Sequence, residues 1–273
     1  MRFPVHFRWR NRIPAPIPES DNTPAPEVCP EEPKSVSEWA VEELLFTPSE
    51  KQAEVLNTAA NKLIVNCSRQ WGKTTTIAIK ALHYALHNPG ANIVVLSRSK
   101  TQAGLLVEKV ADFVSVLGIR RRRAAGQDRS IELPNRSRIV AIAHTGDTSR
   151  GRTANILIVD EAGIVSDQVF AAVAPFVSRT GGAIWLLSTP SGEQGFFYHF
   201  WHTTDQQWVK IKSTVDDCPE INREALELQK QLCPTTFRQE YYCEFLPKPG
   251  RLFTREMVQS LIDTTIPPYF FTL

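Results

Sequence analysis

The feature that most constrains the fold is the stretch KLIVNCSRQWGKTTT, residues 62–76. Its first six residues are mostly apolar and predict a short strand, and a helix-forming run begins at Lys73. The loop between them ends in Gly72, Lys73 and Thr74, as in the phosphate-binding pattern G-x-x-x-x-G-K-[ST]. That pattern has glycine five residues before Gly72, where this chain has Cys67. The stretch therefore predicts the strand–loop–helix of a nucleotide site, with one departure.

Apolar strands and amphipathic helices alternate along most of the chain. We expect helices in 35–46, 49–60, 73–87 and 101–118, strands in 92–97, 155–160 and 183–188, and a hairpin in 130–144. The first helix should turn Trp39, Leu44 and Leu45 inward, and Ser49 should cap the second. This order predicts an α/β fold of the P-loop NTPase (RecA/ASCE-like) type, a mainly parallel sheet with helices on both faces.

Composition excludes several other classes. A chain of 273 residues that is 42% hydrophobic can bury one sizeable core, and its net charge of +2 does not by itself indicate a polyanionic partner. No apolar run reaches the roughly 18 residues of a membrane span. The five cysteines form no CxxC pair, which argues against zinc and disulfide frameworks and favours reduced thiols in a cytoplasmic protein.

The first 36 residues differ from the rest. Basic and aromatic residues alternate at the start, and seven prolines follow between Pro14 and Pro33. Proline fixes φ and removes amide donors, so we expect a disordered or extended arm, either a solvated tail or a contact for nucleic acid or a partner. There is no continuous apolar segment for a secretory signal, and the early prolines oppose the helix of a transit peptide.

The glycine-lysine loop has a specific chemistry. Backbone amides at a helix N-terminus favour phosphate, Lys73 would reach the β- and γ-phosphates, and the Thr74 hydroxyl would ligate Mg²⁺. The apolar strand ILIV is followed by two adjacent carboxylates, Asp160 and Glu161, which are costly near a core unless they have a use. In a nucleotide site Asp160 can hold Mg²⁺ through water and Glu161 can activate the attacking water.

A third signal lies at the end of the strand AIWLLS. Ser188 and Thr189 follow it, and open α/β sheets bind ligands at the carboxyl ends of their strands. The strand at 92–97 lies between the loop and the acid pair in sequence. That order fits P-loop ATPases that have a catalytic glutamate and an inserted central strand, and it fits nucleoside kinases poorly.

These motifs together resemble a known family. SRQWGKTT, VDEAG, LLSTPSG and FRQEYYCEF look like the ATPase half of the tailed-phage terminase large subunit, over about residues 46–253. Members of this family commonly carry Ser-Arg-Gln in the loop, so Cys67 in place of glycine is what the resemblance would lead one to expect.

The resemblance implies roles for individual residues. The nucleotide, ATP with Mg²⁺, would be bound by Gln52, Ser68, Arg69, Gln70, Gly72, Lys73, Thr74 and Thr75. Ser188 and Thr189 would couple hydrolysis to movement, and Gln52 in FTPSEKQ would contact the adenine edge unless it is only an exposed helical residue. The arginine that neutralises the leaving phosphate would be Arg69, or Arg150 acting on a neighbouring subunit.

A basic cluster predicts DNA contact. Seven arginines lie between Arg120 and Arg138, opposed by only two acids, and four of them are consecutive: Arg120, Arg121, Arg122 and Arg123. Contacts to phosphate need no base specificity, which suits a translocating motor. The alternative is a solubilising patch on the surface.

The resemblance also sets the expected domain plan. We expect a Pro-rich arm (1–36), a P-loop ATPase domain (37–250) and a linker or tail (251–273), without the metal nuclease domain of usual large terminases. The expected partners are double-stranded DNA, a portal protein, a small terminase subunit, a separately encoded nuclease and further copies in a ring, in the bacterial cytoplasm. The alternatives are an inactive prophage remnant and another P-loop translocase or helicase-like ATPase.

Overall fold

The computed structural model describes residues 34–120, 129–142, 152–218, 220–247 and 260–261 of the chain. Within them a seven-stranded sheet has the order β3-β4-β2-β5-β6-β1-β7. Its strands are β1 (Lys62–Cys67), β2 (Asn92–Leu96), β3 (Ser130–Glu132), β4 (Arg138–Ile142), β5 (Ile156–Asp160), β6 (Ala183–Ser188) and β7 (Trp208–Ser213). Only the β3–β4 pair is antiparallel. The predicted mainly parallel α/β sheet is therefore confirmed, as is the hairpin.

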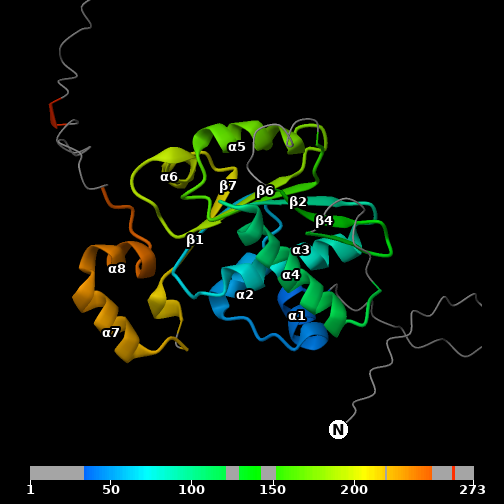
Figure 1. The fold of residues 1–273 in the computed structure, drawn as a ribbon, viewed down its shortest axis with the longest axis horizontal. Helices are drawn as coiled ribbons and strands as arrows, with labels where there is room; N and C mark the ends of the chain where they lie inside the picture. The colour runs from blue at the N-terminus through cyan, green and yellow to red at the C-terminus, as the bar shows by residue number, and fades with distance from the viewer. Residues whose placement is uncertain (1–33, 121–128, 143–151, 219, 248–259, 262–273) are drawn as a thin grey trace, which may run out of the picture.

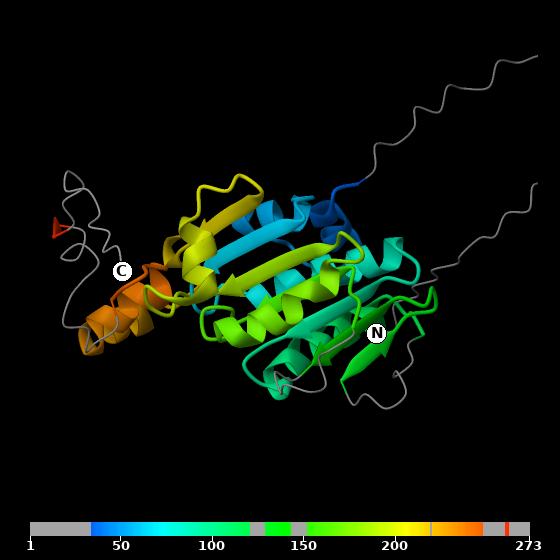
Figure 2. The ribbon, with the colours of Figure 1, turned by 90° about the horizontal axis from the view of Figure 1, so that it is seen from above.

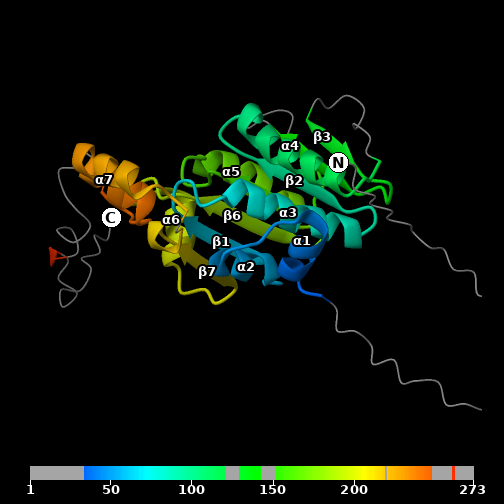
Figure 3. The same cartoon turned by 90° about the horizontal axis from the view of Figure 1, so that it is seen from below.

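Helices cover both faces of this sheet (Figure 1). On one side are α1 (Val36–Leu44), α2 (Glu50–Asn57), α3 (Lys73–His87) and α4 (Lys100–Val116). On the other are α5 (Asp167–Val173), the 3-10 turn η1 (Ala174–Val177) and α6 (Gly195–His202). A short turn η2 (Val215–Asp217) leads from β7 to α7 (Arg223–Leu232) and α8 (Pro234–Tyr241), which lie at one end of the sheet (Figures 2 and 3).

Strand alternation divides the core into two layers. Leu63, Val65 and Cys67 of β1 face the layer that contains α2, α3, α4, α7 and α8. Ile64 between them faces the layer of α5, η1 and α6. Both layers are needed because every central strand is apolar on both faces, as parallel strands buried under helices usually are.

Local signals set several helix ends as expected. Ser49 caps α2, accepting from the amide of Gln52 while the Gln52 side chain accepts from the amide of Ser49. Gly118 follows α4 with φ +65°, a conformation that glycine adopts without strain. The placement of Leu45 on the apolar face of the first helix was wrong. It follows α1 with φ 54°, and its side chain is 86% exposed, because this left-handed cap turns it away from the core.

No element is predicted from the sequence between β5 and β6 or after β6. There the structure has α5, η1, α6, β7, η2, α7 and α8. β7 extends the sheet beside β1, pairing Cys67 with Ser213. Among the described residues, no helix is long and apolar enough to cross a membrane.

Candidate nucleotide site at the carboxyl edge of the sheet

The glycine-lysine loop joins β1 to α3. Cys67 is still part of β1, fully buried and paired with Ser213, so this position has extended geometry that any residue adopts. The left-handed positions of the loop are Gln70 (φ 64°) and Gly72 (φ 88°). A Cβ at Gly72 would lie 3.0 Å from the Gln52 amide nitrogen, so glycine is favoured here by both conformation and space. Glycine is therefore not required at position 67, because β1 continues through Cys67 before the loop begins.

Two carboxylates approach the loop from β5. Asp160 ends the strand and is buried, and its Oδ1 lies 3.9 Å from Nζ of Lys73. The same oxygen accepts a hydrogen bond of 3.0 Å from the amide of Glu161. Burial raises the pKa of Asp160 and the charge of Glu161 adds to this, whereas the Lys73 ammonium and the amide lower it. The sequence prediction that the lysine and both acids meet at one edge of the sheet is thus seen in the structure.

The end of β6 supports this acidic turn. Asp160 pairs with Leu187, and the amide of Ala162 donates to the Leu187 carbonyl at 3.0 Å. Gly163 lies directly against this strand end, because a Cβ there would be 2.9 Å from the carbonyl oxygen of Thr189 and 3.0 Å from Oγ of Ser188. Ser188 and Thr189 therefore contact the turn that carries Glu161, and Glu161 itself has a left-handed φ of 55°.

A cavity of about 500 Å³ opens between these elements. It is lined by Ser68, Arg69, Gln70, Trp71, Gly72, Lys73, Thr74, Thr75, Glu161, Ile164, Thr189 and Glu240. Oε2 of Glu161 is buried, and it has no hydrogen-bond partner among the described residues. A buried carboxylate oxygen without a donor indicates that a ligand or water completes the site. Amides, a lysine and hydroxyls on one wall, facing this carboxylate, fit a phosphate chain.

Arg69 is held by α8. Its guanidinium donates to Oε2 of Glu240 at 2.7 Å, and its amide donates to the Glu240 carbonyl at 2.8 Å. The Arg69 side chain is 62% exposed. Arg69 therefore lies at the cavity wall as predicted, although its charge is engaged by a residue that the sequence analysis did not single out.

Gln52 lies behind the loop and is absent from the cavity wall. Its Nε2 donates to the Trp71 carbonyl at 2.8 Å, and the side chain is only 8% exposed. The alternative of an exposed helical residue is therefore wrong. In this structure the amide supports the backbone of the phosphate loop, and the contact with adenine stays a prediction.

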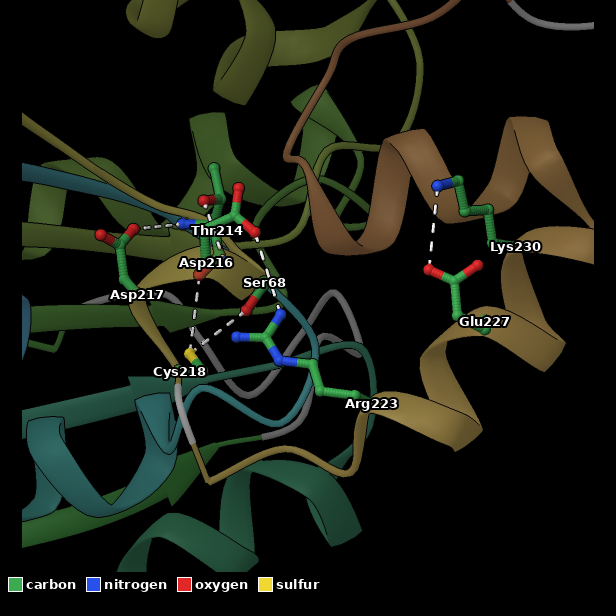
Figure 4. A network of polar contacts seen from close by, with 8 residues as sticks. All are labelled: Ser68, Thr214, Asp216, Asp217, Cys218, Arg223, Glu227 and Lys230. Carbon is green, nitrogen blue, oxygen red and sulfur yellow. Dashed lines mark hydrogen bonds and ion pairs between the residues drawn. The ribbon is translucent and has the colours of Figure 1, made fainter.

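A polar network links the loop to α7 (Figure 4). Oγ of Ser68 is 3.8 Å from Sγ of Cys218, which donates to the Thr214 carbonyl at 3.6 Å. In the middle of η2, Oδ1 of Asp216 lies 4.0 Å from the guanidinium of Arg223 in α7. Burial raises the pKa of Cys218, so this thiol acts as a neutral donor.

Two polar residues near the site were missed by the sequence analysis. Glu240 lies within the motif FRQEYYCEF, but no role is predicted for it, because its partner Arg69 is far away in sequence. Ser97 directly follows β2, whose Leu96 pairs with Val159, so the parallel register places Ser97 beside Asp160. Its Oγ is buried without a partner among the described residues. The Ser that follows NIVVL was the available signal.

The arginines assigned to DNA and catalysis are only partly described. Four of them lie outside the described residues: Arg121, Arg122, Arg123 and Arg150. Arg120 follows α4 and is exposed. Two other arginines of the basic cluster have partners within the chain. Arg129 donates to the Thr101 carbonyl at 2.6 Å across Gly104, and Arg138 pairs with Glu132 at 3.0 Å.

The family comparison agrees with this geometry. Residues 64–260 match the family "Terminase large subunit, T4likevirus-type, N-terminal". The large terminase subunit of Thermus virus P23-45 is 24% identical, in an alignment covering 77% of this chain and 51% of the relative. The chain thus spans about half the length of the curated relatives it matches.

Solved structures show the same fold. The ATPase domain of the Thermus phage P74-26 large terminase has a TM-score of 0.67 at 21% identity, covering 78% of this chain and all of that domain. The large terminase of another thermophilic bacteriophage, solved in complex with ADP, has a TM-score of 0.63 at 15% identity, covering 72% of this chain and 53% of that protein.

Proposed function

We propose, from the premise that the chain belongs to the terminase large-subunit family, that it hydrolyses ATP to drive double-stranded DNA into a phage procapsid. The observation that carries the proposal is the meeting of Lys73, Asp160 and Glu161 at one edge of the sheet, around a cavity of about 500 Å³. The structural neighbour solved with ADP has also been solved with ATP-γ-S, which supports a nucleotide as the ligand here.

The residues divide the chemistry between them. The loop amides and Lys73 hold the phosphates, and Gly72 allows the backbone to approach them closely. Glu161, whose buried oxygen has no donor among the described residues, takes a proton from the attacking water. Ser188 and Thr189, in contact with the turn that carries Glu161, report the state of the phosphates to β6.

Mg²⁺ would accompany the nucleotide. Among the described residues no group of three or more His, Cys, Asp or Glu side chains could hold a metal ion alone. The donors that fit are the Thr74 hydroxyl and, through water, Asp160, with the phosphates completing an oxygen shell. The ion, when bound, neutralises charge on the phosphates.

A cation must also stabilise the leaving phosphate, and two arginines are candidates. Arg69 is at the cavity wall and would have to leave Glu240 to reach the phosphates. Arg150 would act on the site of a neighbouring subunit.

The partners follow from the family and from local charge. Arg120 to Arg123 would contact DNA phosphates, and the chain would assemble as a ring on a portal protein in the bacterial cytoplasm. A small terminase subunit would select the DNA. The domain plan is an arm (1–36), an ATPase domain (37–250) and a linker or tail (251–273).

The test is ATP hydrolysis by the whole chain, with and without double-stranded DNA, beside Lys73→Ala and Glu161→Gln. We expect turnover to fall at least about a hundredfold in both variants, while Glu161→Gln still binds nucleotide. Lys109→Ala and Glu108→Gln on α4 are the matched controls, since Glu108 is exposed and Lys109 is partly exposed.

Turnover that both substitutions leave unchanged would contradict this mechanism. A wild type that hydrolyses no ATP, even after assembly with a portal protein, would favour the inactive remnant. Hydrolysis without any response to DNA in that assembly would favour an ATPase of another lineage.

A further inference from the structure

A second cavity, of about 330 Å³, lies at the opposite edge of the sheet. Its wall includes Ile156 and Ala183, the first residues of β5 and β6, and the loop that leads into β1. The carboxyl-terminal half of α3 forms another side with Lys80, His83 and His87. Nothing in the proposed ATPase mechanism uses this cavity, and α3 separates it from the phosphate loop.

Trp185 gives the cavity an unused donor. Its side chain lines the wall and is only 4% exposed, yet its Nε1–H has no hydrogen-bond acceptor among the described residues. Leaving such a buried donor unpaired costs about 1–3 kcal/mol, so the position is expected to have an acceptor in solution. That acceptor must come from outside the described part of the chain.

Lys80 places a positive charge beside the same ring. Its Nζ lies 5.3 Å from the centroid of Trp185, and it donates to the carbonyls of Leu56 at 2.8 Å and Thr58 at 2.6 Å. A lysine ammonium has three donors, so one remains after these two bonds. Lys80 is 6% exposed, and burial lowers its pKa to about 8, so it keeps most of its charge near neutral pH.

The remaining described wall has no acidic side chain, since none of its residues is Asp or Glu. His83 is neutral near pH 7, because burial lowers its pKa to about 4. The cavity thus combines apolar surface, one cation and one unpaired donor. A cation would be repelled, and a purely apolar molecule would leave the indole donor unpaired.

We propose that this cavity binds a small organic carboxylate with an apolar body, whose oxygens accept from Trp185 Nε1–H and face the Lys80 ammonium. The apolar body would lie against the aliphatic wall that includes Leu56 and Ile156. A bonded carboxylate is a stronger acceptor than water for these donors, because the hydrogen bonds are charge-assisted.

The experiment uses the whole chain labelled with ¹⁵N at its tryptophan indoles, titrated with benzoate and, separately, with neutral benzyl alcohol. Trp185→Phe identifies the Trp185 signal and removes the donor while keeping an aromatic ring. We expect benzoate to move this one indole signal saturably, and benzyl alcohol to bind at least about tenfold more weakly. Trp185→Phe should weaken benzoate binding by a similar factor, measured by calorimetry.

Ala60→Leu tests the location without altering the core, because it adds bulk to a partly exposed loop residue on the wall. It should block benzoate binding, whereas Lys109→Met on α4 should leave it unchanged. Equal binding of benzoate and benzyl alcohol would overturn the proposed class of ligand. An indole signal that benzoate does not move would overturn the proposal and leave water as the acceptor. Full binding by Ala60→Leu would overturn it too, because benzoate would then bind outside this cavity. ATP hydrolysis is not a readout, so failure of the proposed function would not affect this test.

Discussion

Two lysines on α3, seven positions apart, have opposite surroundings. Lys73 begins the helix and lines an open cavity, its side chain is 24% exposed, and its Nζ lies 3.9 Å from Oδ1 of Asp160. Lys80 is 6% exposed and is held by two backbone carbonyls and the face of Trp185. The first has a partner that it can exchange for a ligand. The second holds the end of α2 to the core and keeps one donor in reserve.

The difference shows that residue type alone does not mark a functional lysine. Both side chains lie on one amphipathic helix, and in the sequence only the preceding Gly72 distinguishes Lys73. A buried ammonium is tolerated when hydrogen bonds offset its desolvation, which is a structural use. An ammonium at a helix N-terminus beside a carboxylate is instead placed for anions. Exchanging each lysine for an uncharged residue of similar length should therefore give two different defects.

The largest expected effect is that of Lys73→Met on catalysis. The substitution removes the cation that meets the β- and γ-phosphates, so ATP hydrolysis should fall by about a thousandfold. Stability should change by less than about 1 kcal/mol, because the side chain is partly exposed and its ion pair is long. Steady-state hydrolysis and urea unfolding measure the two quantities. A large loss of stability would show that the two lysines do not differ in the way described.

Lys80→Met should show the reverse pattern. It leaves the carbonyls of Leu56 and Thr58 without their donor, which should lower the free energy of unfolding by about 1–3 kcal/mol in urea. Hydrolysis should stay within about twofold of wild type, because the loop at the other end of α3 is unchanged. Lys62→Met, at a more exposed lysine, is the control. A more stable variant would mean that the desolvation of Lys80 outweighs its hydrogen bonds.

How far the sequence predicts this site depends on how local each signal is. The loop, its strand and its helix are contiguous in sequence, and both acids come at the end of an apolar strand. Because the carboxyl ends of parallel strands lie at one edge of a sheet, these local signals predict that Lys73, Asp160 and Glu161 lie close together. Ser97 follows an apolar strand as Ser188 does, but its place beside Asp160 depends on the register of β2 with β5, which the sequence does not state.

The elements after α6 show the limit of local patterns. β7 pairs in parallel with β1, from which it is far removed in sequence, and no motif announces that pairing. Glu240 reaches Arg69 only because β7 and η2 carry α8 back to the loop. Gln52 was predicted from resemblance alone, and its contact with the Trp71 carbonyl depends on how α2 packs against the loop.

A smaller effect is expected from Glu240→Gln. This substitution tests whether a nucleotide bound at the N-terminus of α3 competes with Glu240 of α8 for the Arg69 side chain. Exposed ion pairs are worth about 0.2–1 kcal/mol, so freeing the guanidinium should tighten ATP binding by about two- to fivefold. Calorimetry with a slowly hydrolysed ATP analogue measures this, with Glu244→Gln, whose partner is Arg238, as the control. Weaker binding would indicate that Glu240 itself holds the nucleotide in place.

An effect of similarly small size concerns His83, near the carboxyl end of α3, in acid. Burial lowers the pKa of His83 to about 4, and the charges of His87 and Lys80 add to this, against 6.5 in the unfolded chain. Between those values the unfolded chain binds more protons, so stability rises with pH across the window and is lost as pH falls from 6.5 to 4. His83 is half-buried, so solvent screening reduces its share to roughly 1 kcal/mol. The free energy of unfolding, measured in urea at pH 6.5 and pH 4, should therefore fall by roughly 1 kcal/mol less in His83→Phe than in wild type. As the control, His199→Phe at an exposed histidine should lose as much stability as wild type over the same pH range. If His83→Phe also loses as much, the desolvation of His83 is weaker than its burial implies.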